Sequence, residues 1–282
     1  MLTFSKYHGL GNDFILFDDA EARLAGRLSV EEIRALCHRQ MGIGADGILI
    51  RTPSSQADHR MLLFNADGST AEISGNGLRC FVLFLRERGY PVDKELRIET
   101  GGGVQHARLI GENMVETTMP APTFSPATGG KHKGGNGEKG RMETLELSVK
   151  DQTFSVLPVT VGNPHGVIFG PERDVAFAEK YGPALEKHTA FPHGANIEFV
   201  HVIDNRSCKL VVWERGAGIT LACGSGSVAT ACAGAAVGHF LFDTPISIHQ
   251  PGGTLEITVG KNFSEIRQRG PATFVFKGEI EI

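Results

Sequence analysis

Two glycine-rich turns, each opening an apolar helix, constrain this chain of 282 residues more than any other feature. The first is Ser74-Gly75-Asn76-Gly77, and the second is Cys223-Gly224-Ser225-Gly226, 149 residues further on. Each follows a short apolar segment and a polar turn, which predicts a strand before it. Each leads into a run with little polar surface, and a helix of that kind is enclosed on most sides. The repeat favours two similar domains that face each other.

The residue at the start of each predicted helix is well placed for chemistry. The first turn of a helix presents unpaired backbone N–H groups and the positive end of the dipole. A cysteine there has its thiolate stabilised, and neighbouring glycines let N–H groups turn toward a carboxylate. Taken alone, Ser74 could be an ordinary N-cap and Cys223 an ordinary buried residue. The duplication favours a functional pair.

Two such helix ends facing one another would hold a small carboxylate and place one side chain on each side of its α-carbon. One group would remove the α-proton, and the other would return a proton to the opposite face. This is stereoinversion by two-base catalysis, which depends on geometry and on the pKa values of the two groups. It requires no metal and no organic cofactor, and we expect neither.

Composition argues against several other classes of protein. A formal net charge of −4 gives no electrostatic reason to expect nucleic acid or a membrane surface as a partner. No apolar stretch is long enough to span a bilayer, and the N-terminal residues lack a secretory pattern. The five cysteines share no CxxC spacing, which indicates reduced thiols rather than disulfides or a zinc site. We therefore expect a cytoplasmic protein.

Three further patterns predict local structure rather than chemistry. Ser29 with Glu32 has the spacing of a capping box at the start of a helix. Gly42-x-Gly44-x-x-Gly47 matches the dinucleotide fingerprint, but a helix is predicted before it and a strand after it, the reverse of what that site needs. The glycine- and lysine-rich residues 129–140 have almost nothing to bury, which predicts a flexible surface loop.

Several longer blocks, in order along the chain, resemble the diaminopimelate epimerase family, the PLP-independent enzymes of lysine and cell-wall precursor synthesis. They are KYHGLGNDF (6–14), GIGADG (42–47), FNADG (64–68), GNPH (162–165) and WERGAGITLACGS (213–225). The resemblance implies an α+β fold of two similar domains, each a mixed β-sheet wrapped around a central helix. The expected domains are residues 1–119 with 268–282, and residues 120–267.

The resemblance also implies roles for individual residues. Cys223 matches one catalytic cysteine, and Ser74 stands where the family has the other. Backbone amides at the two helix ends match those that hold the α-carboxylate: Gly75, Asn76, Gly224 and Ser225. Polar groups match those that bind the substrate's amino groups and distal carboxylate: Asn12, Asn65, Asn163, Asn196, Glu214 and Arg215. Arg215 is the natural fork for a carboxylate. His165 and Asp67 match polar residues near the site.

The serine at position 74 leaves more than one interpretation open. A hydroxyl is a far poorer base than a thiolate at neutral pH, so activity is expected to be reduced. Ser74 is a natural variant that still epimerises, an engineered replacement of a cysteine, or a sign of altered chemistry. The sequence alone does not choose among these three.

Three functions follow from these possibilities. The first hypothesis is a homodimeric enzyme that interconverts LL- and meso-2,6-diaminopimelate. The others are a related PLP-independent racemase or dehydratase with a Ser/Cys pair, and a non-catalytic amino-acid-binding protein. The distal-site set favours the first over the second, because a proline-like substrate has no distal carboxylate for Arg215 to bind; this set is Asn65, Asn196, Glu214 and Arg215.

Overall fold

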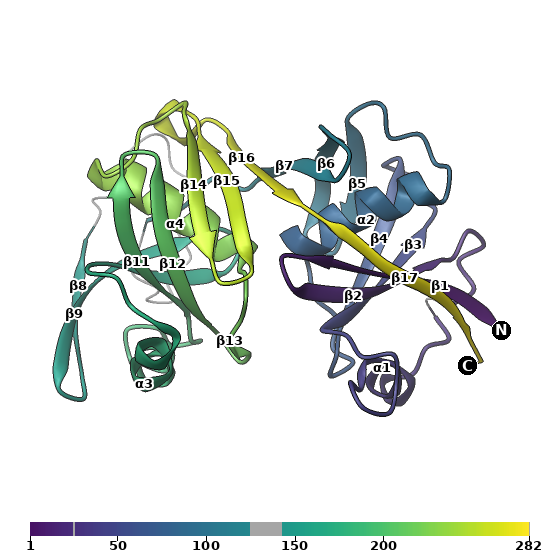
Figure 1. Ribbon diagram of the computed structural model, residues 1–282, viewed down its shortest axis with the longest axis horizontal. Coiled ribbons are helices and arrows are strands. Elements are labelled where there is room, and N and C mark those ends of the chain that lie inside the picture. Colours follow the sequence, from purple (N-terminus) through teal and green to yellow (C-terminus); the bar gives the residue numbers. More distant parts are fainter. Residues whose placement is uncertain (25, 125–142, 282) are drawn as a thin grey trace. The chain divides into compact units, whose positions relative to one another are not determined.

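The computed structural model describes residues 1–24, 26–124 and 143–281 (Figure 1). The chain divides into two compact units, Met1–Thr118 with Arg269–Ile282, and Met119–Gln268. The bounds predicted from the sequence lie one residue away at each junction. Residues 129–140, predicted to form a surface loop, lie outside the described residues.

The first unit is a mixed sheet with two helices. Its helices are α1 (Val30–Cys37) and α2 (Gly75–Glu87). Its strands are β1 (Leu2–Gly9), β2 (Asn12–Asp18), β3 (Gly47–Thr52), β4 (His59–Asn65), β5 (Leu96–Thr100), β6 (Gly103–Leu109), β7 (Met114–Met119) and β17 (Thr273–Ile280). They pair in the order β17–β1–β2–β3–β4–β5–β6–β7, with β2–β3 and β4–β5 parallel and the other pairs antiparallel. The C-terminal strand thus returns to the first half of the chain, as the resemblance implies.

The second unit has the same plan. Its helices are α3 (Val175–Glu186), α4 (Gly224–Val237) and the short η1 (Lys261–Phe263). Its strands are β8 (Leu145–Val149), β9 (Gln152–Thr160), β10 (Pro164–Phe169), β11 (Asn196–Asp204), β12 (Ser207–Glu214), β13 (Gly218–Ile219), β14 (Pro245–Gln250) and β15 (Gly253–Val259), while β16 (Ile266–Pro271) spans the junction at Gln268. The order is β8–β9–β10–β11–β12–β14–β15, with β10–β11 and β12–β14 parallel and the other pairs antiparallel.

The two sheets repeat one pattern of pairing. From β1 to β6 and again from β9 to β15, neighbouring strands pair antiparallel, parallel, antiparallel, parallel and antiparallel. In both units a helix lies in the crossover of each parallel pair, as is usual when parallel strands are joined. The second crossover helix, α2 or α4, packs against strands from across its own sheet. The predicted α+β fold of two similar halves, each around a central helix, is confirmed.

The two central helices are enclosed, as their apolar sequences predict. Every residue of α2 from Asn76 to Leu85 is buried. The helix ends before Gly89, whose φ of +79° suits a residue without a side chain. In α4 the small residues are themselves buried, from Gly226 to Ala235. Small side chains on α4 allow the surrounding strands and loops to approach its backbone closely.

Gly234→Ala in α4 is expected to destabilise the protein by about 2 kcal/mol through overpacking. A Cβ atom at Gly234 would lie 2.2 Å from Cδ2 of the buried Phe240. This clash outweighs the gain of about 1 kcal/mol that alanine brings to a helix interior. Thermal unfolding followed by circular dichroism measures the change. Gly170→Ala, where a Cβ would meet no atom within 4 Å, is the control, and equal stability of the two variants would contradict the prediction.

The capping box predicted at the start of α1 is confirmed. Ser29 caps α1 by accepting from the N–H of Glu32 at 3.2 Å, while Glu32 Oε2 accepts from the N–H of Ser29 at 2.7 Å. The segment Gly42–Gly47 follows α1 and leads into β3, so it is no dinucleotide site. All five cysteines are free and buried. Within the described part of the chain, no helix is long and apolar enough to cross a membrane.

Candidate active site

Ser74 caps the central helix of the first unit. Its backbone is extended, and its Oγ accepts the N–H of Gly77 at 3.0 Å. A Cβ at Gly77 would lie 3.2 Å from Ser74 Cβ, so glycine leaves room for the capping side chain. The hydroxyl therefore lies at the positive end of α2, beside the backbone N–H groups of Gly75 and Asn76.

A hydrogen-bonded row fixes two of the predicted asparagines next to this helix end. Asn12 donates through Nδ2 to Asp46 Oδ2 at 2.8 Å, and Asn76 Nδ2 donates to Asn12 Oδ1 at 3.1 Å. Arg79, fully buried one turn into α2, donates from Nη2 to Asn76 Oδ1 at 2.6 Å and from Nε to the carbonyl of Pro271 at 3.2 Å. The row holds both amide groups in fixed orientations.

Asn65 and Asp67 lie in an exposed turn at the end of β4. Asn65 Nδ2 donates to Ser69 Oγ at 2.9 Å, and Asp67 Oδ1 accepts from the backbone N–H and hydroxyl of Ser69 at 2.9 and 2.6 Å. These bonds, first that from the Ser69 side chain, lower the pKa of Asp67. Among the described residues, no hydrogen bond or ion pair joins Asp67 to Ser74; the partner of the Asp67 carboxylate is Ser69.

Cys223 caps the central helix of the second unit in the same way. Its Sγ accepts the N–H of Gly226 at 3.3 Å and lies 3.6 Å from Ser225 Oγ. Gln250 Oε1 accepts the N–H of Cys223 at 2.7 Å, and Ser227 Oγ donates to the Cys223 carbonyl at 2.8 Å. The helix-capping thiol is thus held at both its side chain and its backbone.

The ionisation of Cys223 differs from the sequence prediction. The hydrogen bonds from Gly226 and Ser225 favour the thiolate, as predicted for a helix end. Burial of the thiol opposes them most strongly, and the carboxylates of Glu214 and Glu198 add to that opposition. The pKa of Cys223 is therefore raised well above its ordinary value. The prediction that Cys223 has a stabilised thiolate is wrong.

Three other predicted residues meet in one network on β10 and β11. His165 lies on β10 opposite Asn196 of β11 and is fully buried. Its Nε2 is 2.9 Å from Asn163 Oδ1, and its Nδ1 is 3.5 Å from Asn196 Nδ2. Asn163 Nδ2 in turn donates to Ser225 Oγ at 3.4 Å. The structure therefore links this network to the first turn of α4.

Glu214 and Arg215 follow at the end of β12. Thr220 donates its hydroxyl to Glu214, and the backbone N–H of Arg215 donates to Asn196 Oδ1 at 2.8 Å. The exposed Arg215 guanidinium donates to the carbonyl of His193 at 3.2 Å. No described Asp or Glu forms an ion pair with it. Because a guanidinium has five N–H donors, Arg215 can still bind a carboxylate.

Four buried polar residues of these sites were not predicted. They are Arg79, Glu198, Gln250 and Gln268, of which Gln268 donates to the Gly224 carbonyl at 2.9 Å. Arg79 follows the first glycine turn directly, so its position gave a signal. The other three lie in ordinary strand sequence, where only the folded pairing shows that they reach α4.

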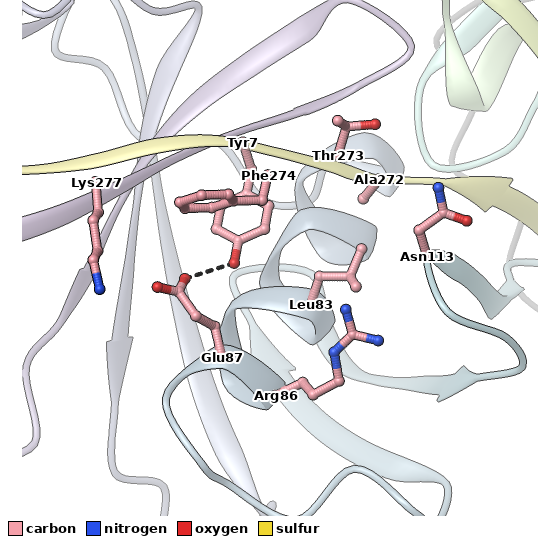
Figure 2. Close-up of a pocket in the computed structure, with 9 residues that line it drawn as sticks. All are labelled: Tyr7, Leu83, Arg86, Glu87, Asn113, Ala272, Thr273, Phe274 and Lys277. Atoms are coloured by element: carbon pink, nitrogen blue, oxygen red, sulfur yellow. Dashed lines mark hydrogen bonds between the residues drawn. The ribbon is translucent and has the colours of Figure 1, made fainter.

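A separate cavity of about 430 Å³ lies in the first unit, away from Ser74. Its lining includes Leu83, Arg86 and Glu87 from the far end of α2, together with Phe274 of β17 (Figure 2). Glu87 accepts the Tyr7 hydroxyl at 2.7 Å there. None of the predicted site residues lines this cavity. Within the described residues, no group of three His, Cys, Asp or Glu side chains is placed to hold a metal ion.

Comparison with known proteins identifies relatives along the whole chain. The family model described as diaminopimelate epimerase matches residues 4–124 and 157–275. The chain is 38% identical to the diaminopimelate epimerase of Carboxydothermus hydrogenoformans over 279 residues, 99% of each chain. It is 39% identical to that of Synechocystis sp. over 291 residues, covering 100% of this chain and 99% of the relative.

Two solved structures share the fold at low sequence identity. A Bacillus anthracis phenazine biosynthesis protein of the PhzF family aligns with a TM-score of 0.72 at 19% identity, covering 100% of this chain and 99% of that one. A probable proline racemase from Agrobacterium radiobacter K84 aligns with a TM-score of 0.71 at 12% identity, covering 100% and 93%. With family-model matches in both halves and relatives near 38% identity along its whole length, the chain belongs to the diaminopimelate epimerase family.

Proposed function

We propose that this chain interconverts LL- and meso-2,6-diaminopimelate by two-base proton transfer, with no metal or organic cofactor. The observation that supports this most is the pair of capping residues at equivalent places in the repeated plan. Ser74 precedes α2, which joins β4 to β5, and Cys223 precedes α4, which lies between β12 and β14. Each unit therefore supplies one helix end with one protic side chain.

Substrate binding divides among the predicted groups by charge. The backbone N–H groups at Gly75, Asn76, Gly224 and Ser225 would hold the α-carboxylate. Asn12, Asn65, Asn163, Asn196 and Glu214 would bind the amino groups, and Arg215 the distal carboxylate. His165 and Asp67 would not touch the substrate and would orient neighbouring polar groups. The Arg215 guanidinium, which forms no ion pair with a described carboxylate, supports diaminopimelate over a substrate with one carboxylate.

Cys223 would act in this scheme as the working acid and base. Its raised pKa keeps it protonated without substrate, so it is a proton donor in that state. A substrate ammonium group beside Glu214 would neutralise one of the carboxylates that disfavour the thiolate. Substrate binding would then lower the pKa of the thiol at the moment when it must accept the α-proton.

The rate of α-proton exchange is expected to rise as pH rises from neutral into the alkaline range. Burial, Glu214 and Glu198 raise the pKa of Cys223, so the thiolate fraction grows only above the usual range of a thiol. Initial rates of deuterium uptake from D₂O, measured at several pD values, test this. A rate that stays flat across that range would contradict ionisation of Cys223 as the limiting event.

One experiment tests the proposed function against its alternatives. The protein is incubated in D₂O with LL- or meso-diaminopimelate, and α-deuterium uptake and stereoinversion are followed together. Exchange supports the epimerase site, and exchange without inversion indicates a single working base. Absence of exchange, both in this protein and in its Ser74→Cys variant, would overturn the proposal. Exchange or loss of water with proline or hydroxyproline instead would indicate the racemase or dehydratase alternative.

We also propose that the chain is a cytoplasmic homodimer. Its free cysteines suit a reducing compartment. On β17 the side chains Phe274, Val275 and Phe276 are 47%, 49% and 43% exposed, an apolar run that a second copy could cover in an isologous contact. Val275→Asp is expected to leave a monomer by light scattering, whereas the unmodified chain gives twice the mass. A monomeric unmodified chain would contradict the proposal.

A further inference from the structure

A buried carboxylate–imidazole pair lies behind the second helix end. Glu198 and His165 are both fully buried, and Glu198 Oε1 lies 2.6 Å from His165 Nδ1. Glu198 and Asn196 are two residues apart on β11, so their side chains share one face, and both reach Nδ1 of His165. The second oxygen of Glu198, Oε2, has no hydrogen-bond partner among the described residues.

The pair determines where the imidazole carries its hydrogens. Asn163 turns its oxygen, which can only accept, to His165 Nε2 at 2.9 Å, so Nε2 carries an N–H. In a pair that is neutral as a whole, one further proton lies between Glu198 Oε1 and His165 Nδ1, 2.6 Å apart, as carboxylate with imidazolium or as carboxylic acid with imidazole. Burial also raises the pKa of Glu198. The Nε2–H group therefore donates to Asn163 Oδ1 at 2.9 Å in either state.

This donation orients the next two groups. With its oxygen turned to His165, Asn163 directs its Nδ2 to Ser225 Oγ, 3.4 Å away. Since the Ser225 oxygen accepts this bond, its single hydrogen is available for Cys223 Sγ, 3.6 Å away. A hydroxyl that donates to sulfur stabilises the thiolate.

The carboxylate is also built into the first turn of α4. A Cβ at Gly226 would lie 2.9 Å from Glu198 Oε1 and 3.2 Å from Cys223 Sγ. Only a residue without a side chain fits between the two at this position. Glu198 is thus packed against the turn that carries the thiol.

We propose that Glu198 is a positioning residue that acts on Cys223 through His165, Asn163 and Ser225. The inference rests on the proposed function, in which Cys223 exchanges the α-proton of the substrate. Glu198 touches neither substrate nor sulfur in this role. It fixes the direction of each hydrogen bond in a second row, which runs from Glu198 through His165, Asn163 and Ser225 to the thiol of Cys223.

A direct effect of charge predicts the opposite result, which makes the inference testable. The titratable groups that face Cys223 are Glu198 and Glu214, with His165 behind them. If Glu198 acted only as a nearby negative charge, its removal would favour the thiolate and speed alkylation of Cys223. If it acts through the row, its removal lets the Ser225 hydroxyl turn away and slows alkylation.

The test is a double-mutant cycle on the alkylation rate of Cys223 by iodoacetamide, read by mass spectrometry of its peptide. Glu198→Leu is expected to slow labelling about tenfold. Glu198→Gln, which keeps the volume but lets His165 move its N–H to Nδ1, is expected to slow it about threefold. Neither change should slow labelling further in a Ser225→Ala protein, because the last bond of the row is already gone.

Three results would overturn the inference: labelling as fast as in the unmodified chain, labelling that is faster, or a loss that adds in full to that of Ser225→Ala. If Glu198→Leu does not fold, the Gln variant decides by the same criteria. Thr230→Val is the matched control, because Thr230 is buried on α4 and its hydroxyl has no partner among the described residues. Alkylation needs no diaminopimelate, so a failed exchange experiment with an intact cycle would reject the proposed function and leave this inference standing.

Discussion

Replacing Ser74 with cysteine is expected to raise the rate of stereoinversion by about a hundredfold or more. A serine hydroxyl releases its proton far less readily than a thiol, and a helix N-terminus favours the anion by only about 1 kcal/mol. The backbone at Ser74 already matches that at Cys223, because both residues are extended N-caps that accept from the N–H three residues on. A thiol at position 74 would therefore have the same backbone conformation and the same helix-capping position as Cys223.

The measurement is stereoinversion of LL-diaminopimelate by the Ser74→Cys variant beside the unmodified chain. Ser74→Ala is the control, since it removes the protic group and leaves the glycine turn. If Ser74→Ala loses all activity while Ser74→Cys gains none, the serine is an adapted catalytic group. In that case the expectation of reduced activity from Ser74 is wrong.

Much of the fold could be predicted because its strongest signals are local. A capping box at Ser29 and two glycine turns before apolar helices each depend on a few neighbouring residues. The duplicated turns also predict the repeated plan, since each turn leads into the enclosed helix of its own sheet. The order of strands could not be predicted from such local signals, because pairings such as β4 with β5 join segments far apart in the sequence.

The site residues were predictable where they depend on local backbone geometry. Their ionisation was less predictable, because it depends on burial in the folded protein. Ser74 and Cys223 can be recognised in the sequence because glycines follow each of them. Glycines at the start of a helix let the backbone N–H groups turn toward a bound carboxylate. The ionisation of Cys223 could not be inferred, since it depends on burial and on the carboxylates of Glu214 and Glu198, and Glu198 comes near α4 only after β11 pairs beside β10. A glutamate in a run of apolar strand residues gives no local sign of its partner.

Cys223→Ser is expected to lower the rate of α-deuterium exchange at least about a thousandfold, because it removes the better of the two proton-transfer groups. Serine is a good N-cap, so the variant keeps the hydrogen bond from Gly226 and should fold as the unmodified chain does. Cys223→Ala removes the cap as well and is expected to cost about 1 kcal/mol of stability in addition. Comparing the two by exchange and by thermal unfolding separates catalysis from folding.

The Ser74→Cys, Cys223→Ser double variant completes this prediction. It moves the one thiol from α4 to α2, that is, to the opposite face of the α-carbon in a two-base mechanism. The unmodified chain is then expected to exchange the α-proton of one configuration, and the double variant that of the other. Deuterium placed in the L and D centres of meso-diaminopimelate, resolved by chiral chromatography and mass spectrometry, measures the preference. The same preference in both proteins would mean that position 74 does not supply the second base.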